Sequence, residues 1–121
     1  MGFFSSRWVA PLRHVIELDG GGLPAGFRAA GVAAQIKASG APDVGLIVCD
    51  SPDASSAARF TASGTQAPPV LLCRERCRLD AVRAIVVTSG NANAATGRPG
   101  FENAVKMQGA TQRLEKNPML I

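Results

Sequence analysis

An apolar run that stops at a polar loop places the strongest constraint on how this chain can fold. Residues 84–87 are long enough for a short buried strand, and the turn formers at residues 88–90 end it. Small and polar residues follow, and these suit a loop where another group must approach the backbone closely. The polar and glycine positions of this loop are our candidate site residues: Ser89, Gly90, Asn91, Asn93, Thr96 and Gly97.

Two interpretations of this loop stay open from its residues. Backbone N–H groups near Gly90 and Gly97, with the asparagine amides, could stabilise an anion or an acyl oxygen. Alternatively, the Asn and Thr side chains hydrogen-bond to the neighbouring backbone and hold the loop in shape, which is the commoner arrangement. No established catalytic motif accompanies the loop, and Lys37, which could be a buried amine, belongs to a residue type that is usually solvated.

The remaining elements are predicted to be short. Apolar segments bounded by turn residues predict extended segments or strands at residues 27–37, 44–49, 59–62, 70–73 and 119–121. Residues 54–58 suggest a helical turn capped by Ser51 or Asp53, and residues 101–115 predict the one longer helix. This order favours an α+β fold, with a mixed or antiparallel sheet of short strands and few helices packed on it.

Composition narrows the possible partners. The net charge of +4 comes mainly from scattered arginines, and with no Tyr and one Trp the chain has few platforms on which bases could stack, so we expect no nucleic-acid partner. Three cysteines, Cys49, Cys73 and Cys77, predict reduced and largely buried thiols rather than a disulfide framework or a metal site. No stretch is long enough to span a membrane, and we expect a cytoplasmic protein.

Four segments, in order, resemble the N-terminal part of the ornithine acetyltransferase family. They are GFRAAGVAAQIKASG at residues 26–40, DVGLIVCDSPDASSAARFT at residues 43–61, APPVLLCRE at residues 67–75 and RAIVVTSGNANAATG at residues 83–97. The SGNANA-x-TG element is the most specific of these. The similarity covers residues 23–121. Residues 1–22 end in three glycines, which sustain neither helix nor strand, and are predicted to be a flexible or tightly turned lead-in.

The resemblance implies a part of a bifunctional glutamate N-acetyltransferase of arginine biosynthesis. Such enzymes are made as one precursor that cuts itself before a threonine, and the new N-terminal Thr carries acetyl from N-acetylornithine to glutamate without a cofactor. The family's oxyanion donors, lysine and nucleophile would fall after Ile121. This chain would then be an incomplete α-chain segment of a larger layered α/β acetyltransferase fold, inactive alone, with the rest of the α chain and the β chain as partners.

On this reading the loop supports the site rather than reacting in it. Asn91 and Asn93 are predicted to hold a buried turn next to the strand that begins at Met119. The sequence departs from the family at three positions: Thr88 stands where Asn is usual, Gln35 where Gly is usual, and Pro68 where Ala is usual. Two alternatives remain, a stand-alone structural or oligomerising module and a part of a related self-cleaving aminopeptidase.

Overall fold

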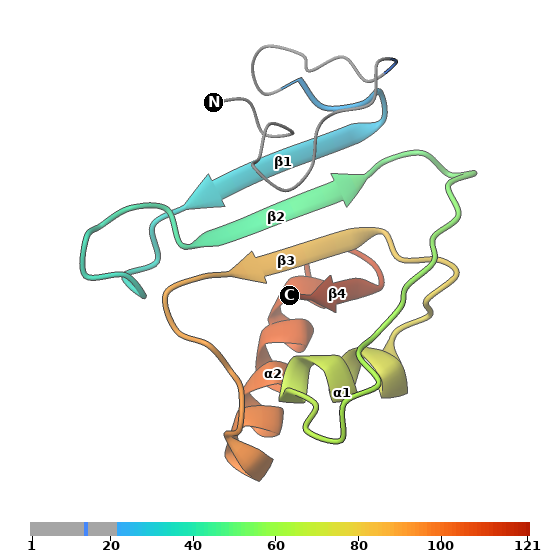
Figure 1. Ribbon diagram of the computed structural model, residues 1–121. Helices are drawn as coiled ribbons and strands as arrows, with labels where there is room; N and C mark the ends of the chain where they lie inside the picture. The colour runs from blue at the N-terminus through green and yellow to red at the C-terminus, as the bar shows by residue number, and fades with distance from the viewer. Residues whose placement is uncertain (1–13, 15–21) are drawn as a thin grey trace.

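The computed structural model describes residue 14 and residues 22–121, and the predicted lead-in therefore lies almost wholly outside the described residues. Four strands and two helices follow one another within this part: β1 Phe27–Val32, β2 Val44–Cys49, α1 Pro68–Arg76, β3 Ala84–Thr88, α2 Gly97–Gln112 and β4 Pro118–Leu120. The strands form one sheet in the order β1-β2-β3-β4 (Figure 1). Because β1, β2 and β3 are antiparallel while β4 runs parallel to β3, the sheet is mixed, and the predicted α+β class is confirmed.

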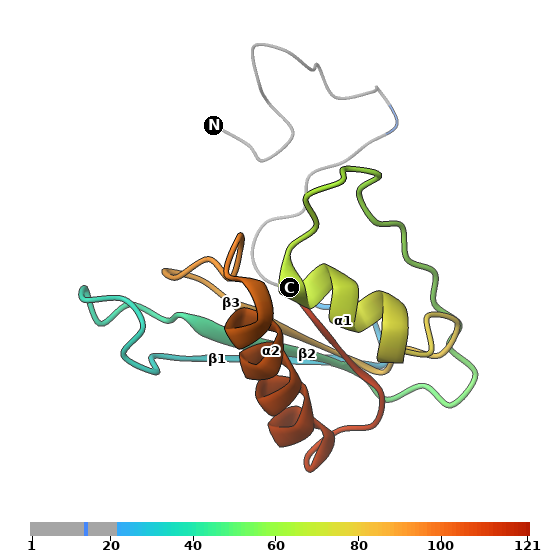
Figure 2. The same cartoon turned by 90° about the horizontal axis from the view of Figure 1, so that it is seen from below.

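The hydrophobic core lies at the β3–β4 end of the sheet. Both views place α1 and α2 beside this end, with β1 at the far side (Figures 1 and 2). The fully buried members of the core come from both helices and from the two neighbouring strands: Leu72, Cys73, Val86, Ala104 and Leu120. All six residues of β1 are exposed, so β1 extends the sheet without contributing to this core.

A buried carboxylate organises the connection between β1 and β2. Asp43 is only 3% exposed, and it accepts hydrogen bonds from the backbone N–H groups of Ala34 at 2.6 Å, Ile36 at 2.7 Å and Lys37 at 2.9 Å. These bonds, led by that from Ala34, lower the pKa of Asp43 below its ordinary value, because they stabilise the charged form. The loop is thereby wrapped around one side chain and held against the start of β2.

The predicted strand at residues 70–73 is wrong, because these residues lie inside α1. Pro68 and Pro69 begin this helix, where the missing proline N–H groups have no intrahelical partner to lose. Leu72 and Cys73 are buried while Leu71 and the following arginines are exposed, a pattern of period 3.6 that a four-residue apolar run disguises as a strand. Pro68 therefore starts a helix instead of interrupting a strand.

Two further predictions fail between β2 and α1, where the chain is irregular. Residues 54–58 form no helical turn and residues 59–62 form no strand. The Ser56 hydroxyl instead donates to the carbonyl of Leu79 and accepts from the N–H of Val82, both at 2.8 Å, and so ties this segment to the approach to β3. Side-chain bonds of this kind replace regular backbone pairing here.

The other predicted elements are found, with shifted boundaries. The strands at residues 27–37, 44–49 and 119–121 correspond to β1, β2 and β4, and the apolar run before the loop is β3. The helix predicted at residues 101–115 begins a turn earlier, at Gly97, and ends at Gln112. In the described part of the chain, neither helix is long and apolar enough to cross a membrane.

Candidate functional site

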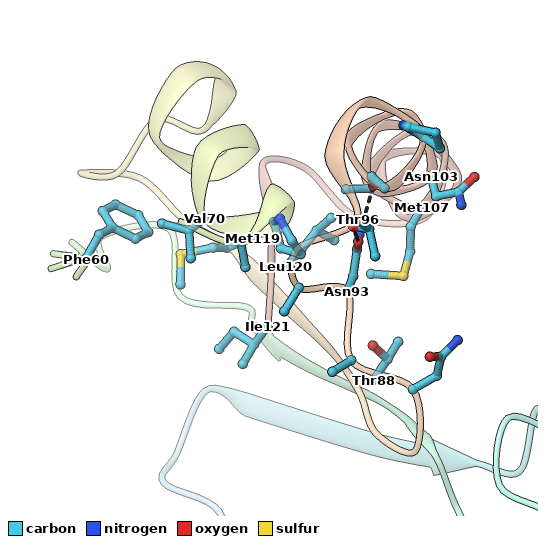
Figure 3. Close-up of a pocket in the computed structure, with 18 of the residues that line it drawn as sticks. Phe60, Val70, Thr88, Asn93, Thr96, Asn103, Met107, Met119, Leu120 and Ile121 are labelled. Atoms are coloured by element: carbon cyan, nitrogen blue, oxygen red, sulfur yellow. Dashed lines mark hydrogen bonds between the residues drawn. The ribbon is translucent and has the colours of Figure 1, made fainter. Parts of the chain in front are cut away.

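A pocket of about 970 Å³ opens where the loop after β3 meets α2 and β4 (Figure 3). One wall is the loop itself, a second is the inner face of α2 with Asn103 and Met107, and the floor is β4 with Met119 and Leu120. The remaining side is closed by Phe60, from the segment before α1, and by Val70 of α1 itself. The pocket therefore joins the loop, α2 and β4, which follow one another in the chain, to side chains from earlier in the sequence.

The loop is held against the start of α2 by one asparagine. The amide of Asn93 donates to the carbonyl of Gly100 at 2.8 Å and accepts a short hydrogen bond from the hydroxyl of Thr96 (Figure 3). Gly100 is buried at this point, and a Cβ there would overlap both the Thr96 hydroxyl and the Asn93 side-chain oxygen. The glycine thus allows the helix to approach the loop closely.

The opposite end of the loop rests on the β1–β2 connection. The N–H of Ser89 donates to the carbonyl of Asp43 at 2.9 Å. Gly90 has a φ of +101°, and a Cβ there would come within 2.7 Å of Lys37 Cγ and 3.4 Å of Ile36 Cγ2. This contact brings Ile36 to the pocket wall, so the loop around Asp43 shapes the pocket from a distance.

The six candidate residues fall into two groups. Asn91, Asn93 and Thr96 line the pocket, whereas Ser89, Gly90 and Gly97 are not among its lining residues. Within the described residues the whole loop is exposed except for Asn93, which is half-buried, so a buried turn in the complete enzyme stays a prediction. Asn91 has no hydrogen-bond partner for its side chain among the described residues, so of the two asparagines it is Asn93 that holds the loop.

The lining offers binding groups but few reactive ones. Arg59 is its only charged residue, and among the described residues that form the wall there is no carboxylate, imidazole, thiol or amine. The remaining polar groups are amides and hydroxyls, from Thr88, Asn91, Asn93, Thr96 and Asn103. With no group suited to accept a proton near neutral pH, the pocket can bind or shape but lacks its own general base.

Several lining residues were missed by sequence reasoning. Phe60 lies in the irregular segment where we expected a strand, and Val70 lies on α1, which we expected to be a strand. Asn103 and Met107 were predicted to lie in a helix, and they do lie on α2. The sequence does not indicate that this helix borders a pocket. Gly100 could have been found, because a glycine within the first turn of a helix often marks a close approach.

Other groups in the described residues do not build a second reactive centre. The amine of Lys37 donates to the carbonyl of Pro42 at 3.2 Å, on a half-buried side chain. The three cysteines are free, with Cys73 buried but Cys49 and Cys77 only half-buried. Across the described ranges, no cluster of three His, Cys, Asp or Glu side chains could hold a metal ion.

The three unusual positions have different structural consequences. Gln35 has a φ of +65°, a left-handed conformation that favours glycine. Thr88 ends β3, donates its N–H to the carbonyl of Ile121 at 3.1 Å and lines the pocket. Pro68 sits at the first position of α1, where proline is well tolerated. Of these three positions, only Gln35 holds a backbone conformation that is unfavourable for a residue with a Cβ.

Comparison with known proteins gives a consistent result. The sequence model of the ArgJ family matches residues 28–119. An arginine biosynthesis bifunctional protein ArgJ from Mycolicibacterium paratuberculosis is 48% identical over 81 residues, which is 67% of this chain and 20% of the relative. The protein of the same name from Mycobacterium tuberculosis is 44% identical over 93 residues, covering 77% of this chain and 23% of the relative. The chain therefore spans about a fifth of the length of these curated relatives.

Solved structures agree with the sequence match. An ornithine acetyltransferase from Mycobacterium tuberculosis, solved with ornithine, is similar with a TM-score of 0.71 and 38% identity, over 80% of this chain and 55% of that chain. An arginine biosynthesis bifunctional protein from Bacillus halodurans is similar with a TM-score of 0.69 and 33% identity, over 79% of this chain and 52% of that chain. The sheet, the loop and the match over residues 28–119 lead to one conclusion: the chain belongs to the ArgJ family.

Proposed function

We propose that this chain is the N-terminal α-chain segment, residues 23–121, of an acetyltransferase of arginine biosynthesis. The observation that carries the proposal is the family match over residues 28–119, supported by the likeness to a solved ornithine acetyltransferase. The complete enzyme transfers acetyl from N-acetylornithine to glutamate in the cytoplasm. In that enzyme, this segment binds the rest of the α chain and the β chain, all of them made from one self-cleaved precursor.

The reaction proceeds through an acetyl-threonine in two balanced steps. The hydroxyl of the N-terminal Thr attacks the acetyl carbonyl of N-acetylornithine, an ester forms, the amide bond breaks, and ornithine leaves with the proton on its amine. The amine of glutamate then attacks the ester carbonyl, an amide forms, the ester C–O bond breaks, and the proton lost by the amine returns the threonine oxygen to a hydroxyl. Each step needs a proton acceptor and an oxyanion site.

This segment supports the reaction without taking part in the bond changes. Among the described residues that line the pocket, Arg59 is the only charged one, and none is a proton acceptor suited to neutral pH. The floor of the pocket is β4, which ends at Leu120, and in this proposal the oxyanion donors follow just beyond Ile121. In this proposal Asn93 and Thr96 fix the loop, and the loop lies beside β4. Because β4 leads toward the oxyanion site, the loop helps to position that site.

A chimera tests the proposal. Residues 23–121 of this chain would replace the corresponding part of the Mycobacterium tuberculosis relative, and acetyl transfer from N-acetylornithine to glutamate would be measured beside the isolated chain. We expect transfer by the chimera and none by the isolated chain. Turnover by the isolated chain, or a folded and self-cleaved chimera without transfer, would overturn the proposal. The intact mass of the natural polypeptide adds a check, because cleavage before a threonine yields two defined fragments.

One structural observation favours a second candidate, an oligomerising module. Large apolar side chains are exposed along the sheet, with exposed fractions of 42% for Phe27, 58% for Val32 and 37% for Ile47. Phe27 and Ile47 lie on one face of the sheet and Val32 on the other, and exposed apolar side chains on and beside an edge strand suit pairing with another chain. A stable, symmetric homo-oligomer of this chain, measured by light scattering, would favour this candidate over the acetyltransferase segment.

A further inference from the structure

The outer edge of β4 is closed by side chains instead of by another strand. One edge of β4 pairs with β3, and Ile121 continues this pairing by donating its N–H to the carbonyl of Val86 at 2.9 Å. The opposite edge presents the carbonyl of Pro118 and both backbone groups of Leu120. Open edges of this kind attract further strands unless they are covered. Here α1 and α2 supply the covering groups.

Cys73 bonds both backbone groups of Leu120. Its Sγ accepts a hydrogen bond from the N–H of Leu120 at 3.3 Å, and its thiol donates to the carbonyl of the same residue at 3.6 Å. A neighbouring strand would make this pair of bonds with its backbone. Cys73 is 1% exposed and Leu120 is 4% exposed, so water cannot replace either bond without rearrangement.

Cys77 and Gln108 hold the other end of the same edge. The thiol of Cys77 donates to the carbonyl of Pro118 at 3.3 Å, and the amide of Gln108 donates to that carbonyl at 3.3 Å and to Cys77 Sγ at 3.2 Å. Gln108 is buried, at 4% exposure, and comes from α2, whereas Cys77 caps α1. Three side chains from two helices thus bond every outward backbone group of Pro118 and Leu120 that can form a hydrogen bond.

The surroundings of these cysteines do not suit other thiol chemistry. A metal site needs further ligands, and in the described residues no third His, Cys, Asp or Glu joins the pair. Burial, with a smaller effect from neighbouring Cys73, raises the pKa of Cys77 to about 12, so this thiol stays protonated at neutral pH. A protonated thiol is a poor nucleophile but can donate a hydrogen bond.

The position of β4 matters because β4 forms the pocket floor. Met119, Leu120 and Ile121 all line the pocket, as do Asn93 and Thr96 of the loop (Figure 3). In the proposed function, the chain beyond Ile121 carries the oxyanion donors. A shift of β4 along or away from β3 would move those donors relative to the substrate.

We propose that Cys73, Cys77 and Gln108 form a clamp that ends the sheet at β4 and acts as a set of positioning residues for acetyl transfer. The part that concerns acetyl transfer rests on the proposed function, whereas the clamp itself does not. The clamp works through hydrogen bonds rather than through packing alone. This distinction makes it testable, since serine keeps the hydrogen-bonding groups of cysteine but fills less space, while valine fills the space without them.

The first experiment measures amide hydrogen exchange at Leu120 in the 121-residue chain, with Cys73→Ser and Cys73→Val compared. We expect Cys73→Val to speed exchange at Leu120 by about three- to ten-fold relative to Cys73→Ser, because it removes the acceptor of that amide. Cys49→Ser and Cys49→Val are the matched controls, since Cys49 lies in β2 and its thiol has no hydrogen bond within the described part. Equal exchange in the two Cys73 variants would overturn the clamp.

The second experiment measures kcat and KM in the complete chimeric enzyme with the same substitutions. We expect Cys73→Val to lower kcat by about ten- to a hundred-fold with little change in KM, and Cys73→Ser to restore most of kcat. A packing role predicts the reverse order, with valine better than serine, and that result would overturn the positioning role. If Cys73→Val fails to fold, Cys77→Val and Cys77→Ser repeat the comparison at a half-buried site.

The two proposals fail in different ways. A folded wild-type chimera without acetyl transfer would overturn the proposed function and with it the positioning role. Exchange at Leu120 would still decide whether the clamp exists. Normal transfer by the wild type together with unchanged kcat in the folded valine variants of Cys73 and Cys77 would overturn the positioning role alone.

Discussion

Gly100 and Thr96 are packed so closely that no side chain larger than hydrogen fits at position 100. A Cβ on Gly100 would overlap the Thr96 hydroxyl and the oxygen of Asn93 that accepts its hydrogen bond. The start of α2 and the loop after β3 therefore behave as one unit. The loop wall of the pocket depends on this contact.

We expect Gly100→Ala to lower the free energy of unfolding by about 1–3 kcal/mol, because the methyl group forces the loop away from α2. Urea denaturation of the 121-residue chain measures this change. Gly109→Ala is the matched control on the same helix, since a Cβ there meets no atom within 4 Å. That control should raise stability by about 1 kcal/mol through helix propensity. A neutral Gly100→Ala would contradict the close contact.

Asn93→Ala should destabilise the chain, whereas Asn91→Ala should not. Asn93 bonds Gly100 and Thr96, and we expect a loss of about 1–3 kcal/mol when the half-buried carbonyl of Gly100 loses its donor. Asn91 is exposed, so its replacement should change stability by less than about 0.5 kcal/mol. Thermal unfolding of the two variants side by side gives the comparison. In the complete chimera, a collapse of acetyl transfer in a stable Asn91→Ala variant would mean that Asn91 contacts the substrate.

Gln35→Gly should stabilise the chain. Gln35 holds a φ of +65°, which costs a residue with a Cβ about 1–2 kcal/mol, and glycine avoids this cost while losing about 0.5–1 kcal/mol through greater freedom when unfolded. We therefore expect a net gain of about 0.5–1 kcal/mol in chemical denaturation. Gln35→Ala keeps the backbone penalty and should give no such gain. If both variants gained the same stability, the gain would come from removing the glutamine side chain and not from relieving the backbone.

Asp43 should make stability depend on pH in the acid range. Hydrogen bonds from the N–H groups of Ala34, Lys37 and Ile36 lower its pKa in the folded state below the ordinary value of 3.8. The stability that ionised Asp43 gives the folded chain is therefore complete at a pH above the ordinary pKa. It is lost as the pH falls through the lower pKa that Asp43 has in the folded state. Asp50, whose pKa is lowered by its hydrogen bond from Arg28, acts in the same direction.

Melting temperatures measured from neutral pH down to the acid range test this linkage. Asp43→Asn should be less stable than the wild type at neutral pH, and the difference should shrink on acidification. The dependence of melting temperature on pH that remains in Asp43→Asn should come largely from Asp50. Asp53→Asn is the control, because Asp53 is exposed and forms no hydrogen bond within the described residues. A parallel pair of curves for wild type and Asp43→Asn would contradict the prediction.

Cys77 should resist alkylation in the folded chain. Its pKa, raised to about 12 mainly by burial, leaves almost no thiolate at pH 8, and the thiolate is the reactive form. Treatment with iodoacetamide followed by peptide mass spectrometry should show slow modification of Cys77 before unfolding and rapid modification of all three cysteines in urea. Rapid native modification of Cys77 would show that its thiol is not held in place.

Sequence reasoning succeeded where one local signal decided the structure. The strands β2 and β3 are apolar runs closed by turn residues, and α2 shows a clear helical period, so they were predicted. It failed at α1, because Val70, Leu71, Leu72 and Cys73 are all apolar, and a run this short carries no period. Pro68-Pro69 was the available signal, since two prolines in succession suit the first turn of a helix better than a strand.

The candidate site was predicted only in part, for a similar reason. Asn93 and Thr96 could be singled out because small polar residues gather after a strand, and they do line the pocket. Phe60 and Ile36 reach the same pocket from segments far away in the sequence, and nothing in their local pattern indicates it. The contact between Gly90 and Lys37 likewise depends on how Asp43 folds the β1–β2 loop, which is a tertiary effect.

The parallel pairing of β3 with β4 has a consequence for how the molecule forms. The chain passes from β3 through the loop and α2 to β4, so this parallel pair joins Ala84 to Pro118, 34 positions apart, whereas the antiparallel pair of β1 and β2 joins Val32 to Val44, 12 positions apart. The parallel pair forms more slowly, because a longer stretch of chain must be ordered before its contacts can stabilise it. We therefore expect the β1–β2 hairpin to form early in folding and β4 to join β3 afterwards, so that the floor of the pocket is completed last.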